Sequence, residues 1–411
     1  MKEEQFDQIY QWVDVRFMEK ILRQSEKDTS IAVSDVFIRA ATAKGDNYTS
    51  DMFRVTVEYS RLNDRERIEQ KKTVIVKVEP IIEGPHKDLI VMSNIFTTEM
   101  NMMSLTLPKM NEILGSRNPL NGRGLFVQRE KPVMLVVEDL APLGFRMADR
   151  QAGLDMDHCL LAIRGLARFH ASSVALCEKE PEQKQRYNQG LFHKDRPFEM
   201  RAFFIEGTKQ LAREAANWPE LDPKYSEKIS RLADKIYERG IEAAICREDE
   251  FNVINHGDFW VNNMLFKYDD EGRPIEHIFV DFQMCTYTSP ALDLNYFFST
   301  SVGDDLLAEH EGTLLAEYRR CLGQTLARSG CRTEPPSIDE LKMSVRQRAT
   351  YGMIASFTLL PIMLQNKDEA KDLAEIIDPK GRMDNPAYRT EAFKKAMRRR
   401  LPVFERMGLL D

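Results

Sequence analysis

The spacing of apolar residues changes near residue 140, and this change restricts the folds open to the chain. Before it, five short segments have the spacing or composition of β-strands: 33–43, 52–60, 71–80, 125–130 and 132–140. Helical spacing is seen at 3–24 and 92–114, and then in most of the remaining chain: 150–180, 197–217, 223–248, 290–301, 304–329, 337–366 and 387–407. We therefore expect an α+β fold with two lobes. An antiparallel sheet would form the N-terminal lobe (1–138), and helices would form most of the C-terminal lobe (139–411).

The helical half of the chain has one exception, which begins with the stretch HGDFWVNNMLF at 256–266. This stretch leads into an expected strand at 263–268, and the turn DDEGRP joins it to a second strand at 277–283. Asp258 and Asn263 lie at the start of this hairpin, and Asp281 lies at its other end. Two carboxylates and one carboxamide at the ends of a hairpin can converge on a small volume.

This set of side chains suits a site for magnesium and phosphate. Mg²⁺ binds oxygen ligands and leaves positions for phosphate. Phosphoryl transfer uses one aspartate to orient and deprotonate a hydroxyl, and an asparagine and another aspartate to hold the metal. The simpler alternative is that Asp258, Asn263 and Asp281 are turn-forming residues beside a hairpin. Their ordered arrangement around two strands favours the functional interpretation.

Lys77 stands in an otherwise apolar strand, TVIVK. A buried lysine needs a partner, because an unpaired buried charge is costly. Glu99 follows 22 residues later, early in the next expected helix. A strand lysine that pairs with a helix glutamate and contacts the α- and β-phosphates is the kinase arrangement. The alternatives are an edge-strand lysine that prevents aggregation and an exposed helix glutamate.

Several motifs resemble one known family. HGDFWVNNMLF, VDFQ and SPALDLNYFFSTS closely resemble the ecdysteroid kinase-like family of arthropods, also called CHK kinase-like. The resemblance extends to AKGDNYTS, EDL and ARFHASS, and so to most of the chain. That family belongs to the superfamily of choline and aminoglycoside kinases, which has a protein-kinase-like fold. The resemblance implies an ATP-dependent kinase that uses Mg²⁺.

The resemblance also implies roles for individual residues. Asp258 falls on the position of the catalytic aspartate, and Asn263 and Asp281 fall on the metal positions. Asp281 begins DFQ where protein kinases have DFG, which suggests that this segment does not flip. Asp293 matches an aspartate that braces the catalytic loop through backbone hydrogen bonds. His256 could be a general base, but we favour a structural histidine that fixes the loop.

Two further segments are expected to bind the nucleotide. A turn within AATAKGDNYTSDMF would hold the phosphates through backbone N–H groups and hydroxyls, with these residues: Gly45, Asn47, Thr49 and Ser50. This loop has one glycine where protein kinases have three, so it is weak evidence alone. The segment from Glu138 to Leu140 would be the hinge, whose backbone would hydrogen-bond adenine.

The acceptor site is expected between the region 171–250 and the apolar segment 351–364. Trp260, Tyr351 and Phe357 are its candidate residues. An ammonium substrate such as choline would need aromatic and acidic partners, and an aminoglycoside would need many carboxylates. An apolar wall instead suits a hydrophobic alcohol such as an ecdysteroid or another steroid. The alternative is that 351–364 is only helix core.

The composition excludes some classes of partner. A net charge of −7 argues against a nucleic-acid binder. The chain shows neither a signal-peptide core nor an apolar run long enough to span a membrane. Its six cysteines form no C-x-x-C pair, which favours a reduced, cytoplasmic protein. We expect a monomer that acts on a small-molecule hydroxyl.

Three other functions are alternatives to a kinase that acts on a hydrophobic alcohol. A non-catalytic ligand-binding pseudokinase is disfavoured because the lysine and both aspartates are present. A detoxification kinase for foreign or dietary alcohols stays open, because the difference lies in the shape of the pocket. A protein kinase is disfavoured because H-R-D and A-P-E motifs are missing and only 12 residues separate Asp281 from Asp293.

Overall fold

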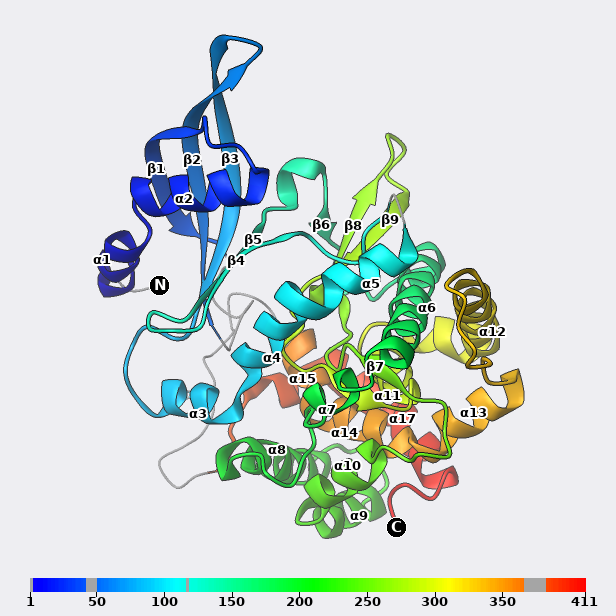
Figure 1. Cartoon of the computed structure of the whole chain (residues 1–411). Coiled ribbons are helices and arrows are strands. Elements are labelled where there is room, and N and C mark those ends of the chain that lie inside the picture. Colours follow the sequence, from blue (N-terminus) through cyan, green and yellow to red (C-terminus); the bar gives the residue numbers. More distant parts are fainter. Residues whose placement is uncertain (1–2, 42–49, 116–117, 366–381) are drawn as a thin grey trace.

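The computed structural model describes residues 3–41, 50–115, 118–365 and 382–411 (Figure 1). Its N-terminal lobe is built around a five-stranded antiparallel sheet with the strand order β1-β2-β3-β5-β4. The strands are β1 (Ala32–Ala40), β2 (Asp51–Asn63), β3 (Glu66–Val78), β4 (Gly124–Gln128) and β5 (Met134–Glu138). The predicted α+β architecture and its five-stranded sheet are confirmed. β5 ends at Glu138, the residue at which we place the boundary between the lobes.

The expected N-terminal helix is two helices, α1 (Glu3–Trp12) and α2 (Val15–Glu26). The break lies at Asp14, whose side chain accepts a hydrogen bond from Phe17 N and caps α2. The buried face of α2 packs with apolar strand residues in the core of this lobe. In Figure 1, α2 lies across the sheet.

The hairpin of β2 and β3 is longer than predicted. We expected the two strands to cover 52–60 and 71–80, but they pair as far as Asn63 and Glu66. Only Asp64 and Arg65 form the turn, both with positive φ angles (53° and 126°). The end of this hairpin projects beyond the rest of the sheet (Figure 1). Its side chains are mostly exposed on both faces, so no alternation of apolar and polar residues marked the strands.

The predicted helix at 92–114 is interrupted twice. It consists of α3 (Pro85–Ser93), α4 (Ile95–Asn101), the π-helical turn η1 (Met102–Thr106) and α5 (Leu107–Leu114). Asn94 adopts a left-handed conformation between α3 and α4. Pro108 lies in the first turn of α5 and has no backbone N–H to donate to a helical hydrogen bond. This fits the wider, π-helical turn η1 that precedes α5.

The C-terminal lobe is mainly helical, as expected. Its longer helices are α6 (Met156–Lys179), α8 (Phe198–Ala215), α9 (Lys224–Ala233), α10 (Ile236–Ala244), α11 (Ala291–Thr300), α12 (Asp304–Arg328), α13 (Ile338–Gln347), α14 (Ala349–Thr358) and α17 (Glu391–Arg406). The short elements are η2 (Ala141–Leu143), α7 (Gln183–Arg186), η3 (Val261–Asn263), α15 (Leu360–Leu364) and η5 (Pro386–Arg389). The helices expected at 223–248 and 337–366 are therefore divided into two and three.

The predicted hairpin is present as β8 (Met264–Tyr268) and β9 (Pro274–Phe279), and the short β6 (Arg146–Met147) pairs with β8. A second pair, β7 (Val253–Asn255) and β10 (Thr286–Thr288), was not predicted. β7 ends directly before HGD, and β10 begins five residues after Asp281. This pair therefore fixes the bases of two loops that carry the candidate catalytic residues.

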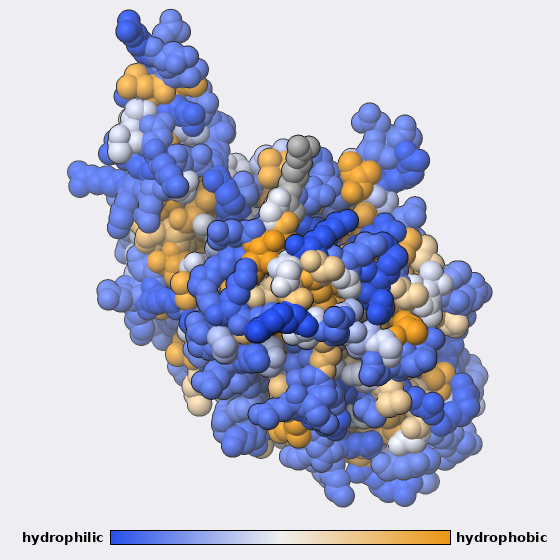
Figure 2. Space-filling model, turned by 45° about the vertical axis from the view of Figure 1, so that its right-hand side comes forward, coloured by the Kyte–Doolittle hydropathy of each residue, from blue (hydrophilic) through white to orange (hydrophobic). Residues whose placement is uncertain are grey.

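One helix of the described residues, α6, is long and apolar enough to cross a membrane, but 78% of its most apolar stretch is buried inside the fold. Most of its buried apolar residues belong to a hydrophobic cluster that also contains residues of α4, η1 and α5. This burial is typical of a core helix. The face of the molecule in Figure 2 is mainly hydrophilic, with apolar residues in scattered patches.

Candidate active site

Gly257 allows the loop between β7 and β8 to pass against the segment that follows Asp281. Its φ angle is +79°, in the left-handed region. A Cβ atom at this position would lie 2.0 Å from the carbonyl oxygen of Met284. Only glycine therefore satisfies both the conformation and the space, and the two loops lie in contact here.

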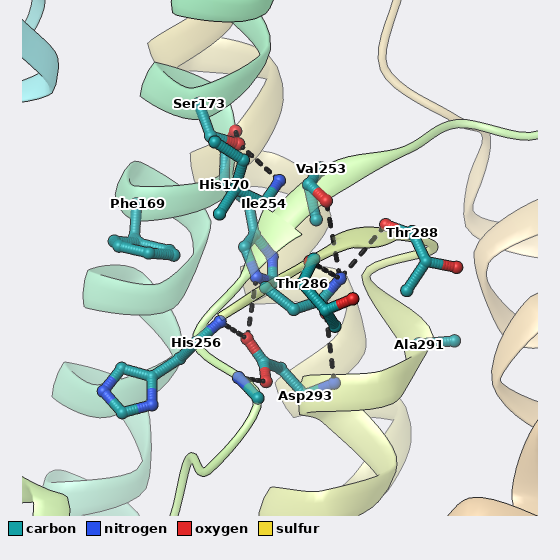
Figure 3. A network of polar contacts seen from close by, with 12 residues as sticks. Phe169, His170, Ser173, Val253, Ile254, His256, Thr286, Thr288, Ala291 and Asp293 are labelled. Carbon is teal, nitrogen blue, oxygen red and sulfur yellow. Dashed lines mark hydrogen bonds and ion pairs between the residues drawn. The ribbon is translucent and has the colours of Figure 1, made fainter. Parts of the chain in front are cut away.

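Asp293, near the start of α11, holds the beginning of the same loop. Its carboxylate accepts hydrogen bonds from the backbone N–H groups of His256 (2.6 Å) and Gly257 (2.8 Å), as Figure 3 shows. His170 Nε2 lies 3.0 Å from the same carboxylate. These contacts satisfy a carboxylate that is completely buried. The geometry is that of a brace, which is the role we expected for Asp293.

His256 points away from Asp293 (Figure 3). Its Nε2 lies 3.1 Å from the carbonyl oxygen of Val280, the residue directly after β9, and donates to it. Its ring packs among aromatic residues that include Phe279 and Phe282. Burial lowers the pKa of His256, so the ring is neutral. This placement links the two loops and fits a structural histidine.

Asp258 follows in the same loop and faces a cavity. Its Oδ2 accepts a hydrogen bond from Asn263 Nδ2 (2.8 Å), and its Oδ1 accepts one from the hydroxyl of Tyr296 (2.6 Å). Burial raises the pKa of Asp258 to about 6, aided by the charge of Asp281 and opposed by these two hydrogen bonds. The group is therefore ionised at neutral pH and is more basic than an exposed aspartate.

Lys77 on β3 pairs with two carboxylates. Its Nζ lies 2.6 Å from Glu99 Oε2 on α4 and 3.1 Å from Asp281 Oδ1. The side chains of Lys77 and Glu99 are only 5% and 6% exposed. Burial alone would lower the pKa of Lys77, but the carboxylates of Asp281 and Glu99 together raise it. The lysine is a fixed positive charge between the two lobes.

Asp281 has an unusual backbone, with φ at +67°. Aspartate tolerates the left-handed region better than most residues, and such outliers gather at functional sites. The strand β9 ends two residues before it, and this turn directs its carboxylate toward Lys77.

The oxygen atoms near Asp258 fit a hard cation that is also bound by phosphate. The carboxamide nitrogen of Asn263 donates to Asp258, so its carbonyl oxygen is the atom that remains for a metal. Asp281 contributes a carboxylate to the same cavity. Among the described residues, no group of three or more His, Cys, Asp or Glu side chains could hold a metal by itself. A site with few protein ligands is what Mg²⁺ uses when phosphate oxygens complete its shell.

The cavity has a volume of about 210 Å³ and joins these polar residues to an apolar wall. Its polar lining includes Asp258, Asn263, Asp281, Gln283 and Tyr296. Its apolar lining comes mainly from α3, α8 and the segment around α15: Leu89, Ile90, Met200, Phe203, Phe204, Leu359, Ile362 and Met363. Trp260, Leu191, Ile95 and Met284 complete the apolar surface.

Two of the expected acceptor residues lie elsewhere. Phe357 is completely buried in the hydrophobic core of the C-terminal lobe and does not line this cavity. Tyr351 lines a different cavity of about 860 Å³, on the far side of Leu191. The segment 351–364 does reach the expected cavity, but through residues after the break between α14 and α15. Trp260 lines it as expected.

The structure describes the expected hinge, but only one residue of the expected nucleotide turn, Ser50. The Glu138 side chain accepts a hydrogen bond from Arg123 N (3.1 Å), and Leu140 is buried. Between them, Asp139 pairs with Arg54 on β2 at 2.8 Å, a link that sequence reasoning missed. Ser50 immediately precedes β2. The other expected nucleotide-turn residues lie outside the described ones: Gly45, Asn47 and Thr49.

A scan against family models matches the ecdysteroid kinase-like family over residues 44–331. The chain belongs to this family. Membership supports a small-molecule kinase activity and agrees with the two-lobed, protein-kinase-like arrangement described above. No curated protein sequence matches the chain.

Solved structures with similar folds include a choline kinase from Cryptosporidium parvum Iowa II, with 13% identity, 97% of this chain and 98% of that chain covered, and a TM-score of 0.46. An ethanolamine kinase from Plasmodium vivax has 10% identity, with 99% of this chain and 97% of that chain covered, and a TM-score of 0.46. The amicoumacin kinase hAmiN, solved with AMP-PNP, Ca²⁺ and Ami, has 12% identity, coverage of 96% for both chains and a TM-score of 0.46. All three are distant likenesses.

Proposed function

We propose that this protein is an ATP-dependent kinase that phosphorylates a hydroxyl group of a small lipophilic alcohol, with an ecdysteroid or a related steroid as the first candidate. The observation that carries this proposal is one cavity in which Asp258, Asn263 and Asp281 face an apolar wall. The polar residues suit phosphoryl transfer, and the wall suits an acceptor with little charge.

In the proposed reaction, the acceptor oxygen attacks the γ-phosphorus of ATP, and its proton passes to the carboxylate of Asp258. The bond between the γ-phosphorus and the β–γ bridging oxygen breaks, and its electron pair leaves with ADP. With a pKa of about 6, Asp258 is ionised at neutral pH and can accept the proton as the transfer proceeds. The product is a phosphate monoester of the alcohol.

The nucleotide would lie between the lobes. Lys77, held by Glu99, would contact the α- and β-phosphates. The carbonyl oxygen of Asn263 and the carboxylate of Asp281 would hold Mg²⁺, which neutralises phosphate charge when it is bound. The turn that contains Ser50 and the backbone of Glu138–Leu140 are the proposed contacts for the phosphates and adenine.

The size of the cavity limits how an acceptor can bind. Ligand pockets usually have volumes of roughly 300–1,000 Å³, and this cavity has about 210 Å³. It would therefore enclose the reacting end of a steroid-sized molecule, and the remainder would lie on the rim. Two exposed apolar residues, Met92 (68%) and Phe198 (67%), each precede in sequence a residue that lines the cavity, and we propose them as rim contacts.

A screen by mass spectrometry tests the proposal. Purified protein, ATP and Mg²⁺ would be incubated with ecdysteroids, other sterols, plant phenolic alcohols, choline and ethanolamine, with Asp258→Asn as the blank. A phosphate added to an ecdysteroid would support the first candidate, and a phosphate added only to foreign alcohols would identify a detoxification kinase. Phosphorylation of choline alone would contradict the proposed acceptor class.

A result without any phosphorylated product would contradict the catalytic proposal if ATP and one alcohol nevertheless bound. Melting shifts with each alcohol would show such binding. The protein would then be a ligand-binding pseudokinase.

A further inference from the structure

We infer that Tyr296 is a positioning residue for the proposed kinase reaction, and that its hydroxyl holds the Asp258 carboxylate in the orientation needed to receive the acceptor proton. This inference rests on the proposed function. It concerns a residue that sequence reasoning placed only in the apolar pattern of the helix at 290–301.

The contact itself is short and directed. The Tyr296 hydroxyl lies 2.6 Å from Asp258 Oδ1, within the range of hydrogen bonds from a hydroxyl to a carboxylate. Burial raises the pKa of Tyr296 well above its usual value, as does the charge of Asp258, so the hydroxyl keeps its proton and donates. Asn263 Nδ2 donates to the other oxygen, Oδ2, at 2.8 Å. With a donor on each oxygen, the carboxylate cannot rotate without losing a hydrogen bond.

Tyr296 shares its helix with the brace of the catalytic loop. Asp293 lies three residues earlier on α11, so the two side chains project from the same face of the helix. Asp293 fixes the backbone at His256 and Gly257, and Tyr296 fixes the side chain of the next residue. Just after α11, the hydroxyl of Ser301 accepts a hydrogen bond from Val261 N (3.0 Å). One helix thus sets both the path of the loop and the direction of its carboxylate.

The hydrogen bond also has an electrostatic effect. A donor to the ionised form of a carboxylate favours that form and lowers its pKa. The hydroxyl of Tyr296 opposes the rise that burial causes at Asp258. Loss of the hydroxyl should therefore raise the pKa of Asp258 and free the carboxylate to turn.

A purely structural tyrosine would behave differently, and Tyr388 provides the comparison. Tyr388 is also fully buried, but its hydroxyl has no hydrogen-bond partner among the described residues and lies in the hydrophobic cluster of the C-terminal lobe. Tyr388→Phe and Tyr296→Phe each remove one buried hydroxyl. Only the second removes a donor from Asp258.

The experiment compares these two variants with the wild type. For Tyr296→Phe we expect kcat to fall on the order of 10- to 100-fold, an unchanged KM for ATP, and an acidic limb of the pH–rate profile at higher pH. For Tyr388→Phe we expect wild-type kcat and pH profile. A wild-type kcat and an unmoved limb in Tyr296→Phe would overturn the inference.

A second measurement does not depend on turnover. Crystal structures of the wild type, Tyr296→Phe and Tyr388→Phe show the orientation of the Asp258 carboxylate directly. We expect it to turn in Tyr296→Phe, which loses the donor to Oδ1, and to stay in place in Tyr388→Phe; an unchanged orientation in Tyr296→Phe would refute the inference. If the wild type phosphorylates no alcohol, the proposed function fails while this comparison still decides the inference.

If Tyr296→Phe does not fold, 4-fluorophenylalanine at position 296 replaces it, because its fluorine occupies the space of the hydroxyl and donates no hydrogen bond. The same turn of the Asp258 carboxylate is expected, and an unchanged orientation would overturn the inference.

Discussion

Replacing Lys77 with methionine should destabilise the fold as well as remove the proposed phosphate contact. The Nζ of Lys77 lies 2.6 Å from Glu99 Oε2 and 3.1 Å from Asp281 Oδ1. At an effective dielectric constant of about 20, these separations correspond to Coulomb attractions of about 6 and 5 kcal/mol. Desolvation offsets most of this energy, and removing one partner of a buried ion pair typically costs about 3–5 kcal/mol. We expect a loss of about 3–5 kcal/mol in the free energy of unfolding at pH 7.

The loss should depend on pH in a known direction. Without Lys77, Glu99 remains buried, and burial already raises the pKa of its carboxyl above the value of the unfolded chain. A raised carboxyl pKa disfavours the folded state increasingly as the pH rises above the unfolded pKa. Lys77→Met should therefore be less destabilised at pH 5 than at pH 8. Lys77→Met/Glu99→Leu should recover stability at pH 8 without recovering activity.

Urea unfolding followed by circular dichroism, at pH 5 and pH 8, measures these differences. Lys71→Met is the matched control: Lys71 lies on the same strand and pairs with Glu58 at 3.1 Å, but the two side chains are 62% and 42% exposed. Such surface pairs contribute about 0–1 kcal/mol. If Lys77→Met lost no more stability than Lys71→Met, the assignment of a structural buried ion pair would be wrong.

Three further predictions concern the site. First, kcat/KM should decrease as the pH falls through about 6, because protonation would inactivate Asp258, the proposed base; a flat profile between pH 5 and 7 would contradict this role. Second, Gly257→Ala should lower the melting temperature far more than Gly272→Ala, since both glycines have φ near +78° but only Gly257 would place a Cβ against Met284; equal melting temperatures would refute this contact. Third, Met363→Gln should raise the KM for a lipophilic acceptor several-fold and leave the KM for ATP unchanged. Steady-state kinetics measures both KM values, and a rise in the KM for ATP would contradict this prediction.

Much of the fold could be predicted because buried apolar residues recur at regular intervals along helices and strands. The strands of the N-terminal sheet alternate or run apolar, and they lie where expected apart from the exposed end of the β2–β3 hairpin. Lys77 and Glu99 were found because a charge among apolar residues requires a partner, and the structure supplies it. The strands β7 and β10 were missed because three residues are too few to show a period.

There is also a physical reason why two of the expected acceptor residues do not line this cavity. The helix α14 is buried on nearly all sides. The pattern of its apolar residues in the sequence therefore does not indicate which side faces a cavity. Tyr351 and Phe357 therefore seemed equivalent to Leu359 and Met363. Tyr296 was missed for a similar reason: within NYFF it resembles any other aromatic residue of a core helix, and its polar contact spans 38 positions in the sequence.

The cavity is assembled from two separate sets of elements. The groups that would perform the chemistry stand on the β7–β8 loop, the turn after β9, and α11, whereas the apolar wall comes from α3, α8 and the segment around α15. Substitutions in the wall leave the hydrogen bonds of Asp293 and Asp258 intact. Gene duplication followed by changes in those wall elements would therefore yield kinases with new acceptors at little catalytic cost. The same positions are the first choice for a library that aims to redirect the proposed kinase to another acceptor.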